Sequence, residues 1–280
     1  MTETMRIPEV APLRSGLLDA IPGVRHALTG RVAGMGRADG NVGFSAPRDR
    51  DDAWAMRQRW CAAAGLEARR LVTLGQIHGA EVLVAEARHA GWGAMPGTPQ
   101  IGLADALATD AEGPVLVTLH ADCQPILMVD PGTRRRGPVV AAIHAGWRGT
   151  VANIVGRAVA VMHAVYGSDA ADIHVFLGPA IGACCYEVGD EVAAAWRDRG
   201  GADAAGALRP SGDRVHLSLT EANAILLARI GILPDHIERS PVCTRCAGDH
   251  WFSHRGQGAN TGRFAALIAI DASKRTDSAT

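Results

Sequence analysis

Residues 114–143 read PVLVTLHADCQPILMVDPGTRRRGPVVAAI and contain three apolar runs of strand length. The runs cover 114–119, 125–129 and 138–143, and the turn Asp130-Pro131-Gly132 begins the connection between the last two. Neither connection has room for the crossover helix that usually joins parallel neighbouring strands. The segment therefore predicts a mixed or largely antiparallel α+β fold rather than a doubly wound parallel sheet.

Helix and strand signals continue on both sides of this segment. We expect a helix over 51–64, with Asp51 or Asp52 as its N-cap and Gly65 at its end. Further helices are expected over 150–166, 188–199 and 218–230, and the last begins with the capping-box sequence Ser218-Leu-Thr-Glu221. Strands are expected over 71–76, 81–85, 173–177 and 263–270. No linker or repeat divides the chain, so we predict a single domain over 1–280, with an ordered core of about 12–272 and a polar tail over 271–280.

Composition and charge exclude several classes of partner. The 280 residues carry a formal net charge of -1, so the chain lacks the basic surface typical of proteins that bind nucleic acids or anionic membranes. No apolar run reaches the roughly 18 residues of a membrane span, and the N-terminus lacks the apolar core of a signal peptide. We therefore expect a cytoplasmic protein without nucleic-acid or membrane partners. Its oligomeric state is not indicated. The charge run Arg134-Arg135-Arg136 is expected to be a solvated loop.

Histidine and cysteine side chains, which can bind metal ions, follow expected strands at three places. GQIHGA at 75–80 holds His78, HADCQP at 120–125 holds Cys123, and IHAGWRG at 143–149 holds His144. Side chains at the ends of rigid elements are well placed for chemistry. Two histidines and a cysteine match the three ligands of a catalytic zinc site, which leaves a fourth position open. Copper suits the same ligands, and a set of structural histidines is the other interpretation, because no local motif connects the three residues.

Other residues near these segments have two interpretations each. Asp122, beside Cys123, is a candidate for moving a proton or for a structural hydrogen bond. Arg148 precedes Gly149-Thr150 at the expected helix start, where free N–H groups favour phosphate, but it also suits a surface position. Trp147 could stack on a purine or pack in the core.

The six cysteines do not suggest a disulfide framework, because the chain is large and the adjacent pair Cys184-Cys185 is awkward to bridge. Cys243-Thr-Arg-Cys246 has the spacing of half a zinc finger. No second Cys-x-x-Cys and no paired histidines accompany it, so two thiols in a loop are the simpler interpretation. The roles of these four cysteines stay open at the level of sequence.

Several motifs in a fixed order carry a resemblance to a known family. They are QIHGAEV, ATDAEG, HADCQP, AAIHAGWRGT, LGPAIGACCYEVG and VCTRC with the following WFSHR and NTGR. The chain, from about Arg25 to Ala266, resembles the family first described as laccase-domain or multicopper polyphenol oxidases, now described as purine nucleoside phosphorylases. Some members are described as peptidoglycan editing factors. The N-terminal part departs from the family pattern, because Gly30 precedes Arg31 where threonine is usual and Met56 precedes Arg57 where asparagine is common.

The resemblance implies a single-domain, layered α/β/β/α sandwich with zinc bound by His78, Cys123 and His144. It also implies phosphorolysis of adenosine, inosine and methylthioadenosine, with adenosine deaminase side activity. A zinc site would serve deamination by lowering the pKa of the attacking water. Nucleosides and phosphate are then the partners, and the tentative substrate contacts are Arg31, Asn41, Arg57 and, in the first histidine loop, Gln76.

Two other enzyme classes and one non-catalytic role remain possible from sequence. In a cysteine hydrolase or amidase, Cys123 would be the nucleophile and His144 its base, without a metal. A copper-dependent polyphenol oxidase is disfavoured, because multicopper clusters use His-x-His pairs and none occurs among the eleven histidines. An interaction module with a structural thiol site would turn over no nucleoside.

Overall fold

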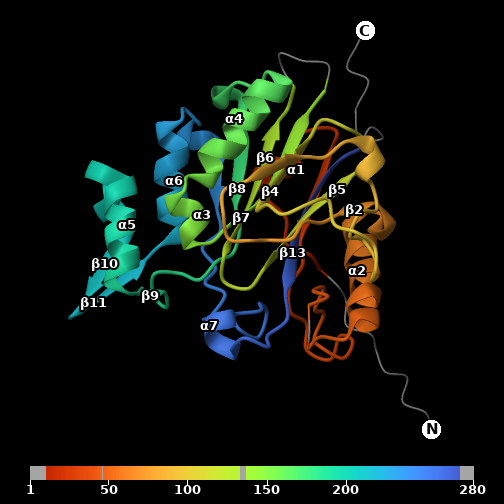
Figure 1. Cartoon of the computed structure of the whole chain (residues 1–280), viewed down its shortest axis with the longest axis horizontal. Helices are drawn as coiled ribbons and strands as arrows, with labels where there is room; N and C mark the ends of the chain where they lie inside the picture. The colour runs from red at the N-terminus through yellow and green to blue at the C-terminus, as the bar shows by residue number, and fades with distance from the viewer. Residues whose placement is uncertain (1–10, 46, 133–136, 272–280) are drawn as a thin grey trace.

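The chain passes from one β-sheet to another at residues 121–123. The computed structural model describes residues 11–45, 47–132 and 137–271 (Figure 1). Strand β5 (Val115–His120) belongs to a four-stranded sheet, whereas β6 (Gln124–Asp130) belongs to a six-stranded sheet. The three connecting residues include Asp122, whose φ of 87° makes the sharp change of direction. The apolar runs at 114–119 and 125–129 are thus strands, as expected, but of different sheets.

Both large sheets are mixed. The four-stranded sheet has the order β1 (Val24–Leu28), β13 (Phe264–Ile270), β5 and β2 (Leu71–Val72), with only the β5–β2 pair parallel. The six-stranded sheet has the order β12 (Ile237–Arg239), β8 (His174–Leu177), β6, β7 (Val139–Ala145), β4 (Ala106–Thr109) and β3 (Val82–Val84). Its four central strands are antiparallel, and its edge pairs are parallel. The predicted mixed α+β class is confirmed.

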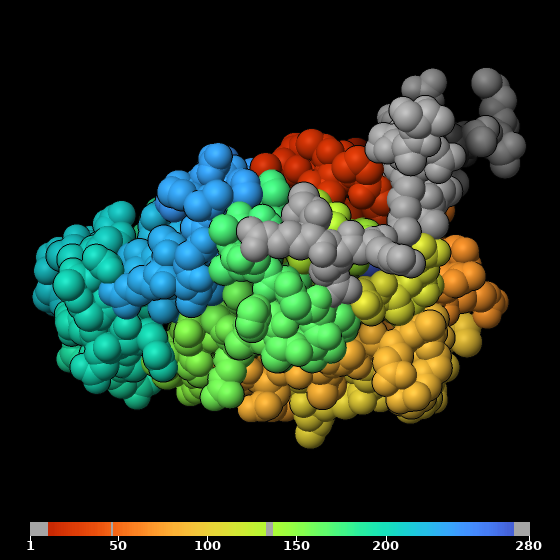
Figure 2. Space-filling view, turned by 90° about the horizontal axis from the view of Figure 1, so that it is seen from above, coloured from red at the N-terminus to blue at the C-terminus, as the bar shows by residue number. Residues whose placement is uncertain are grey.

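The two sheets pack face to face between layers of helices. Leu116 and Ile268 of the smaller sheet share one core with Leu127 and Phe176 of the larger sheet. On the outer face of the larger sheet lie α4 (Ile154–Tyr166) and α6 (Leu219–Arg229), which Figure 2 shows side by side. Helix α2 (Arg50–Ala64) covers the outer face of the smaller sheet. The layered α/β/β/α sandwich implied by the family resemblance is confirmed.

Strand β7 explains why the apolar runs do not alternate with polar residues. Ala141 and Ile143 face the helices, whereas Val140 and Ala142 face the other sheet. Successive side chains point to opposite faces of a strand. Because both faces of the central sheet are covered, every residue of β7 is buried, a pattern more usual in parallel sheets.

Two of the helix boundaries that differ from expectation have a clear structural cause. Asp49 caps α2, because its side chain accepts hydrogen bonds from the amides of Asp51 and Asp52. The helix expected over 150–166 is two helices, α3 (Trp147–Val151) and α4. They are separated at Asn153, whose left-handed backbone (φ 62°) cannot continue a helix and whose side chain caps α4.

The smaller elements lie around this sandwich. Helix α5 (Asp190–Gly200) and the hairpin β10 (Leu208–Ser211) and β11 (Arg214–Leu217), which pairs with β9 (Glu187–Val188), form one end of the molecule (Figure 1). The remaining helices are α1 (Gly16–Asp19) and α7 (His254–Gln257). None of the helices in the described part of the chain is long and apolar enough to cross a membrane. The expected Arg134-Arg135-Arg136 loop and the polar tail beyond Asp271 lie outside the described residues.

Candidate metal centre and active-site cavity

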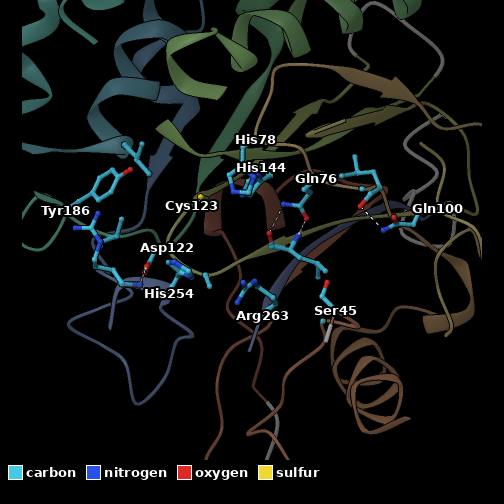
Figure 3. Close-up of a pocket in the computed structure, with 18 residues that line it drawn as sticks. Ser45, Gln76, His78, Gln100, Asp122, Cys123, His144, Tyr186, His254 and Arg263 are labelled. Atoms are coloured by element: carbon cyan, nitrogen blue, oxygen red, sulfur yellow. Dashed lines mark hydrogen bonds between the residues drawn. The ribbon is translucent and has the colours of Figure 1, made fainter. Parts of the chain in front are cut away.

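Three distant segments bring His78, Cys123 and His144 together. His78 lies in the loop after β2, Cys123 in the passage between the two sheets, and His144 near the end of β7. One ligand atom of each side chain lies within 4.8 Å of the others. Figure 3 shows the three side chains gathered on one side of a cavity. The grouping expected from the sequence therefore exists in space.

Asp105 holds both histidine-bearing segments, and sequence reasoning missed it. Its carboxylate is fully buried and accepts a hydrogen bond from His144 Nδ1 at 2.8 Å. It also accepts the backbone N–H groups of Ile77, His78 and Gly79 at 3.2, 3.0 and 2.6 Å. With Nδ1 engaged, His144 presents Nε2 to the cluster, the arrangement that orients histidine ligands in metal sites. These amide bonds also stabilise the left-handed backbone of His78, whose φ is 59°.

Close packing of the three segments depends on Gly146, the N-cap of α3. A Cβ atom there would lie 3.0 Å from Cys123 Sγ and 3.4 Å from His78 Cδ2. Contacts this short would push the ligand side chains out of position. The glycine after His144 in AAIHAGWRGT is therefore required by the approach of two other chain segments, not by a turn.

The donor set fits a single zinc ion. Two imidazoles and one thiolate are catalytic zinc ligands, and all three side chains line the cavity, which leaves an open side for a fourth ligand. Burial raises the pKa of the Cys123 thiol, but the neighbouring His144 and His78 lower it to about 6. Burial lowers the pKa of His144, but the Cys123 thiolate and Asp105 raise it to about 9. The protein thus stabilises the cysteine as the thiolate, the form that binds metals.

His120 and Asp122 flank the cluster without belonging to it. The His120 ring nitrogens lie 3.2 Å from the Cys123 carbonyl and 2.8 Å from Thr118 Oγ1, so neither is free for a metal. Burial and the nearby His144 lower the pKa of His120 well below its usual value. The Asp122 oxygens accept hydrogen bonds from Thr244 Oγ1 at 2.7 Å and the Arg255 amide at 2.6 Å. Structural interactions occupy both residues.

The cluster opens into a cavity of about 590 Å³, within the range of small-molecule sites. Polar and charged side chains from distant segments complete its lining. They are Ser45, Gln76, Gln100, Asp122, Tyr186, His254, Arg255 and Arg263.

Arg263 is the most informative lining residue that sequence reasoning missed. Its half-buried side chain lies across the cavity from His78 and His144 in Figure 3. Burial lowers its pKa, and so does the nearby Arg48, but an arginine remains protonated in proteins. It supplies a cation for an anionic ligand. The motif NTGR was noted as a family signature, but its arginine lies more than a hundred residues beyond the motifs that hold His78, Cys123 and His144.

Three of the tentative substrate contacts do not line this cavity. Arg31 pairs with Asp39 and donates to the Gly248 carbonyl. Asn41 is buried and bonds Gly43 and the Arg263 amide. Arg57 is buried and donates to the carbonyls of Val42, Gly93 and Ala94. The family resemblance suggested these residues as substrate contacts, but their hydrogen bonds hold the N-terminal segment and α2 in place.

Of the two other predicted substrate contacts, Gln76 lies at the cavity and Arg148 does not. Gln76 lines the cavity, and its amide group forms two 2.8 Å hydrogen bonds with the backbone of Leu119. Arg148 is exposed, lies over the Trp147 ring and is not a lining residue. The helix start expected at Gly149-Thr150 is wrong, because α3 begins at Trp147 and the Thr150 amide donates to the Gly146 carbonyl at 2.9 Å. Phosphate binding at this helix stays a prediction.

Most of the chain resembles proteins of one known family. A family model described as "multi-copper polyphenol oxidoreductase laccase" matches residues 25–271. The purine nucleoside phosphorylase YlmD of Geobacillus stearothermophilus is 34% identical over 229 residues, which cover 81% of this chain and 82% of that protein. The solved structure of YlmD has a TM-score of 0.86 and 32% identity, and the match covers 94% of this chain and 98% of that one.

A second activity occurs among the relatives. The adenosine deaminase RL5, from an unknown prokaryotic organism, is 33% identical over 200 residues, which cover 71% of this chain and 74% of that protein. The chain belongs to the laccase-like family that the model at residues 25–271 describes. The resemblance inferred from the sequence motifs is confirmed.

Proposed function

We propose that this protein is a zinc-dependent purine nucleoside phosphorylase that acts on adenosine, inosine and methylthioadenosine, with adenosine deaminase side activity. Relatives named purine nucleoside phosphorylase and adenosine deaminase support an enzyme of nucleoside metabolism. We also propose that residues 1–280 act as one domain in the cytoplasm, on free nucleosides and phosphate.

One observation carries the proposal: the cluster of His78, Cys123 and His144 and the cation of Arg263 share one cavity. Phosphorolysis needs phosphate near C1′ of the ribose and polarisation of the departing base. A guanidinium forms strong bidentate hydrogen bonds with phosphate. Arg263 therefore suits the phosphate, and the opposite side of the cavity, at the zinc ligands, suits the purine base.

The bound zinc ion would supply Lewis acidity and lower the pKa of a water in the cavity. The protein's own side chains hold the residues around the cavity in position. Asp105 orients His144 and the His78 loop through its four hydrogen bonds. Asp122 joins the Thr244 and Arg255 segments to the passage between the sheets. Because both of its oxygens are engaged, we assign Asp122 a positioning role rather than proton transfer.

A metal-free cysteine hydrolase is the second candidate, and the thiolate–imidazolium pair of Cys123 and His144 favours it. A peptidoglycan precursor would be its substrate. Redox chemistry through several coppers has less support, because residues 11–45, 47–132 and 137–271 contain one histidine-bearing ligand cluster. One copper in place of zinc would suit the same ligands.

A product assay separates these candidates. Purified enzyme is incubated with adenosine, inosine and methylthioadenosine, with and without phosphate. The proposal expects ribose-1-phosphate, or its methylthio analogue, only when phosphate is supplied. Equal release of base without phosphate would indicate a hydrolase, and no turnover of any nucleoside would contradict the proposal.

A further inference from the structure

Four cysteines outside the cavity form a second cluster. Cys184 and Cys185 lie in a tight turn after β8, and Cys243 and Cys246 lie in the loop after β12. Their Sγ atoms all lie within 4.8 Å of one another. Cys243 and Cys246, which have the spacing of half a zinc finger, thus lie beside a second pair of cysteines. This pair, Cys184-Cys185, occurs about sixty residues earlier in the chain and matches no metal-binding motif.

The distances suit four thiolates around one ion. Cys246 Sγ lies 3.6 Å from Cys184 Sγ and 3.4 Å from Cys185 Sγ. With Zn–S bonds of about 2.3 Å, a tetrahedral zinc ion places its sulfur ligands about 3.8 Å apart. A disulfide would need about 2.05 Å, and all four cysteines are free thiols. Small adjustments of the side chains would complete a tetrahedron.

The backbone around the cluster is shaped for close approach of its two halves. Turn hydrogen bonds from the Cys185 and Tyr186 amides to the Gly182 carbonyl, both 2.9 Å, direct the two adjacent thiols to the same side. The Gly182 N–H donates to Cys243 Sγ at 3.2 Å. A Cβ atom at Gly182 would lie 3.2 Å from both Cys184 Sγ and Cys243 Cβ. The absence of a side chain at Gly182 thus allows the cysteine-bearing segments to meet.

We propose that Cys184, Cys185, Cys243 and Cys246 bind one zinc ion as a closed structural site, separate from the site at His78. Four thiolates leave no position for substrate, which is the pattern of structural rather than catalytic zinc. Zinc is favoured because soft thiolate ligands in tetrahedral geometry suit it. The proposal does not depend on which substrate the cavity takes.

The position of the four cysteines indicates what the zinc ion would stabilise. Both cysteine-bearing segments form part of the cavity's support: Ile181 and Tyr186 line the cavity, and Thr244 donates to the Asp122 carboxylate. The segments already meet at a bridge between Ala180 and Cys243, and the Ile181 amide donates to the Asp122 carbonyl at 2.9 Å. A zinc ion would cross-link them just behind this wall. It would hold Tyr186 and Asp122 in place without contacting substrate.

The test is a zinc count on purified full-length variants after gel filtration in reducing buffer with a weak chelator. The wild-type protein should contain two zinc ions per chain, and the C184S/C246S variant should contain one. The C61A variant is the matched control, because Cys61 is a buried free cysteine outside both clusters, and it should keep the wild-type zinc content. Equal zinc in wild type and C184S/C246S would overturn the proposal.

A spectroscopic measurement covers the case in which C184S/C246S does not fold. The C123A variant removes a ligand from the His78 site only, so its remaining zinc reports on the four cysteines. Zinc X-ray absorption should give four sulfur ligands at about 2.3 Å. Nitrogen or oxygen ligands there, bound iron, or cysteine disulfides in protein prepared under reducing conditions would each contradict a four-thiolate zinc site. Failure of the nucleoside assay would change none of these readouts.

Discussion

His144 Nδ1 lies 2.8 Å from the buried carboxylate of Asp105, which also accepts the backbone N–H of His78 at 3.0 Å. One side chain therefore positions two of the three candidate metal ligands. It fixes the ring orientation of His144 directly and the position of the His78 side chain through its backbone. Asp105 never touches the cavity, yet the geometry of the centre depends on it.

Replacing Asp105 with asparagine should weaken zinc binding roughly 10- to 100-fold, the usual effect of losing a partner that orients a histidine ligand. Competition with a chromophoric chelator measures the affinity. Asp130→Asn is the matched control, because Asp130 is also buried but caps the turn after β6, where its carboxylate accepts the Gly132 amide at 2.8 Å. Equal affinities in the two variants would show that Asp105 does not support the centre.

Replacing Cys123 with alanine should remove the zinc of the His78 site and most nucleoside turnover, yet leave the protein folded. The two sheets bury their apolar faces without this thiol, so circular dichroism should stay unchanged. His120→Ala should retain the metal, because both His120 nitrogens already have partners. A Cys123→Ala enzyme with wild-type phosphorolysis would refute the ligand assignment.

Arg263 and Arg148 offer a comparison between two arginines with different positions. The first lines the cavity and the second is exposed outside it. Losing a charge-assisted hydrogen bond costs about 1.5–3 kcal/mol, so Arg263→Gln should raise the KM for phosphate about tenfold or more. Arg148→Gln should change it less than about twofold, and both should keep their zinc. If Arg148→Gln alone raised the phosphate KM, the phosphate would instead bind at α3, as the sequence first suggested.

Substitution of Gly146 tests how closely the segments that carry His78 and Cys123 must approach it. Gly146→Ala places a methyl group 3.0 Å from Cys123 Sγ, so it should lower zinc affinity and turnover severalfold. Gly189→Ala is a close control: Gly189 is also a helix N-cap with extended backbone (φ −74°, against −77° at Gly146), but no atom lies within 4 Å of its added Cβ. Steady-state kinetics over a zinc titration measures both the affinity and the turnover. Identical rates in the two variants would contradict a steric role for Gly146.

Removing the metal separates the two catalytic candidates. Dialysis against a strong chelator should abolish phosphorolysis, and one equivalent of zinc returned to the His78 site should restore it. A cysteine hydrolase would keep its activity after chelation, because Cys123 and His144 already form an activated pair without metal. Retained turnover would therefore favour the hydrolase.

The sequence by itself determined the secondary-structure elements of the central layers. The runs at 114–119, 125–129 and 138–143 are long enough and apolar enough to predict β5, β6 and β7, and their short connections exclude a regular parallel arrangement. The motifs around His78, Cys123 and His144 pointed to the three residues that the fold brings together. These signals are local, so they can be read from short stretches of chain.

Only the tertiary structure decided what surrounds those three residues. Which sheet a strand joins depends on packing of distant segments, so the passage at 121–123 between two sheets could not be predicted from its own residues. Asp105 lies outside the motifs, and the motif NTGR does not by itself indicate what Arg263 does. Both residues acquire a role because β4 and β13 begin beside the cavity. The pairing of Cys184-Cys185 with Cys243 and Cys246 has the same cause. Ligand sites form where separate chain segments converge, and convergence is a property of the packed fold rather than of any one segment.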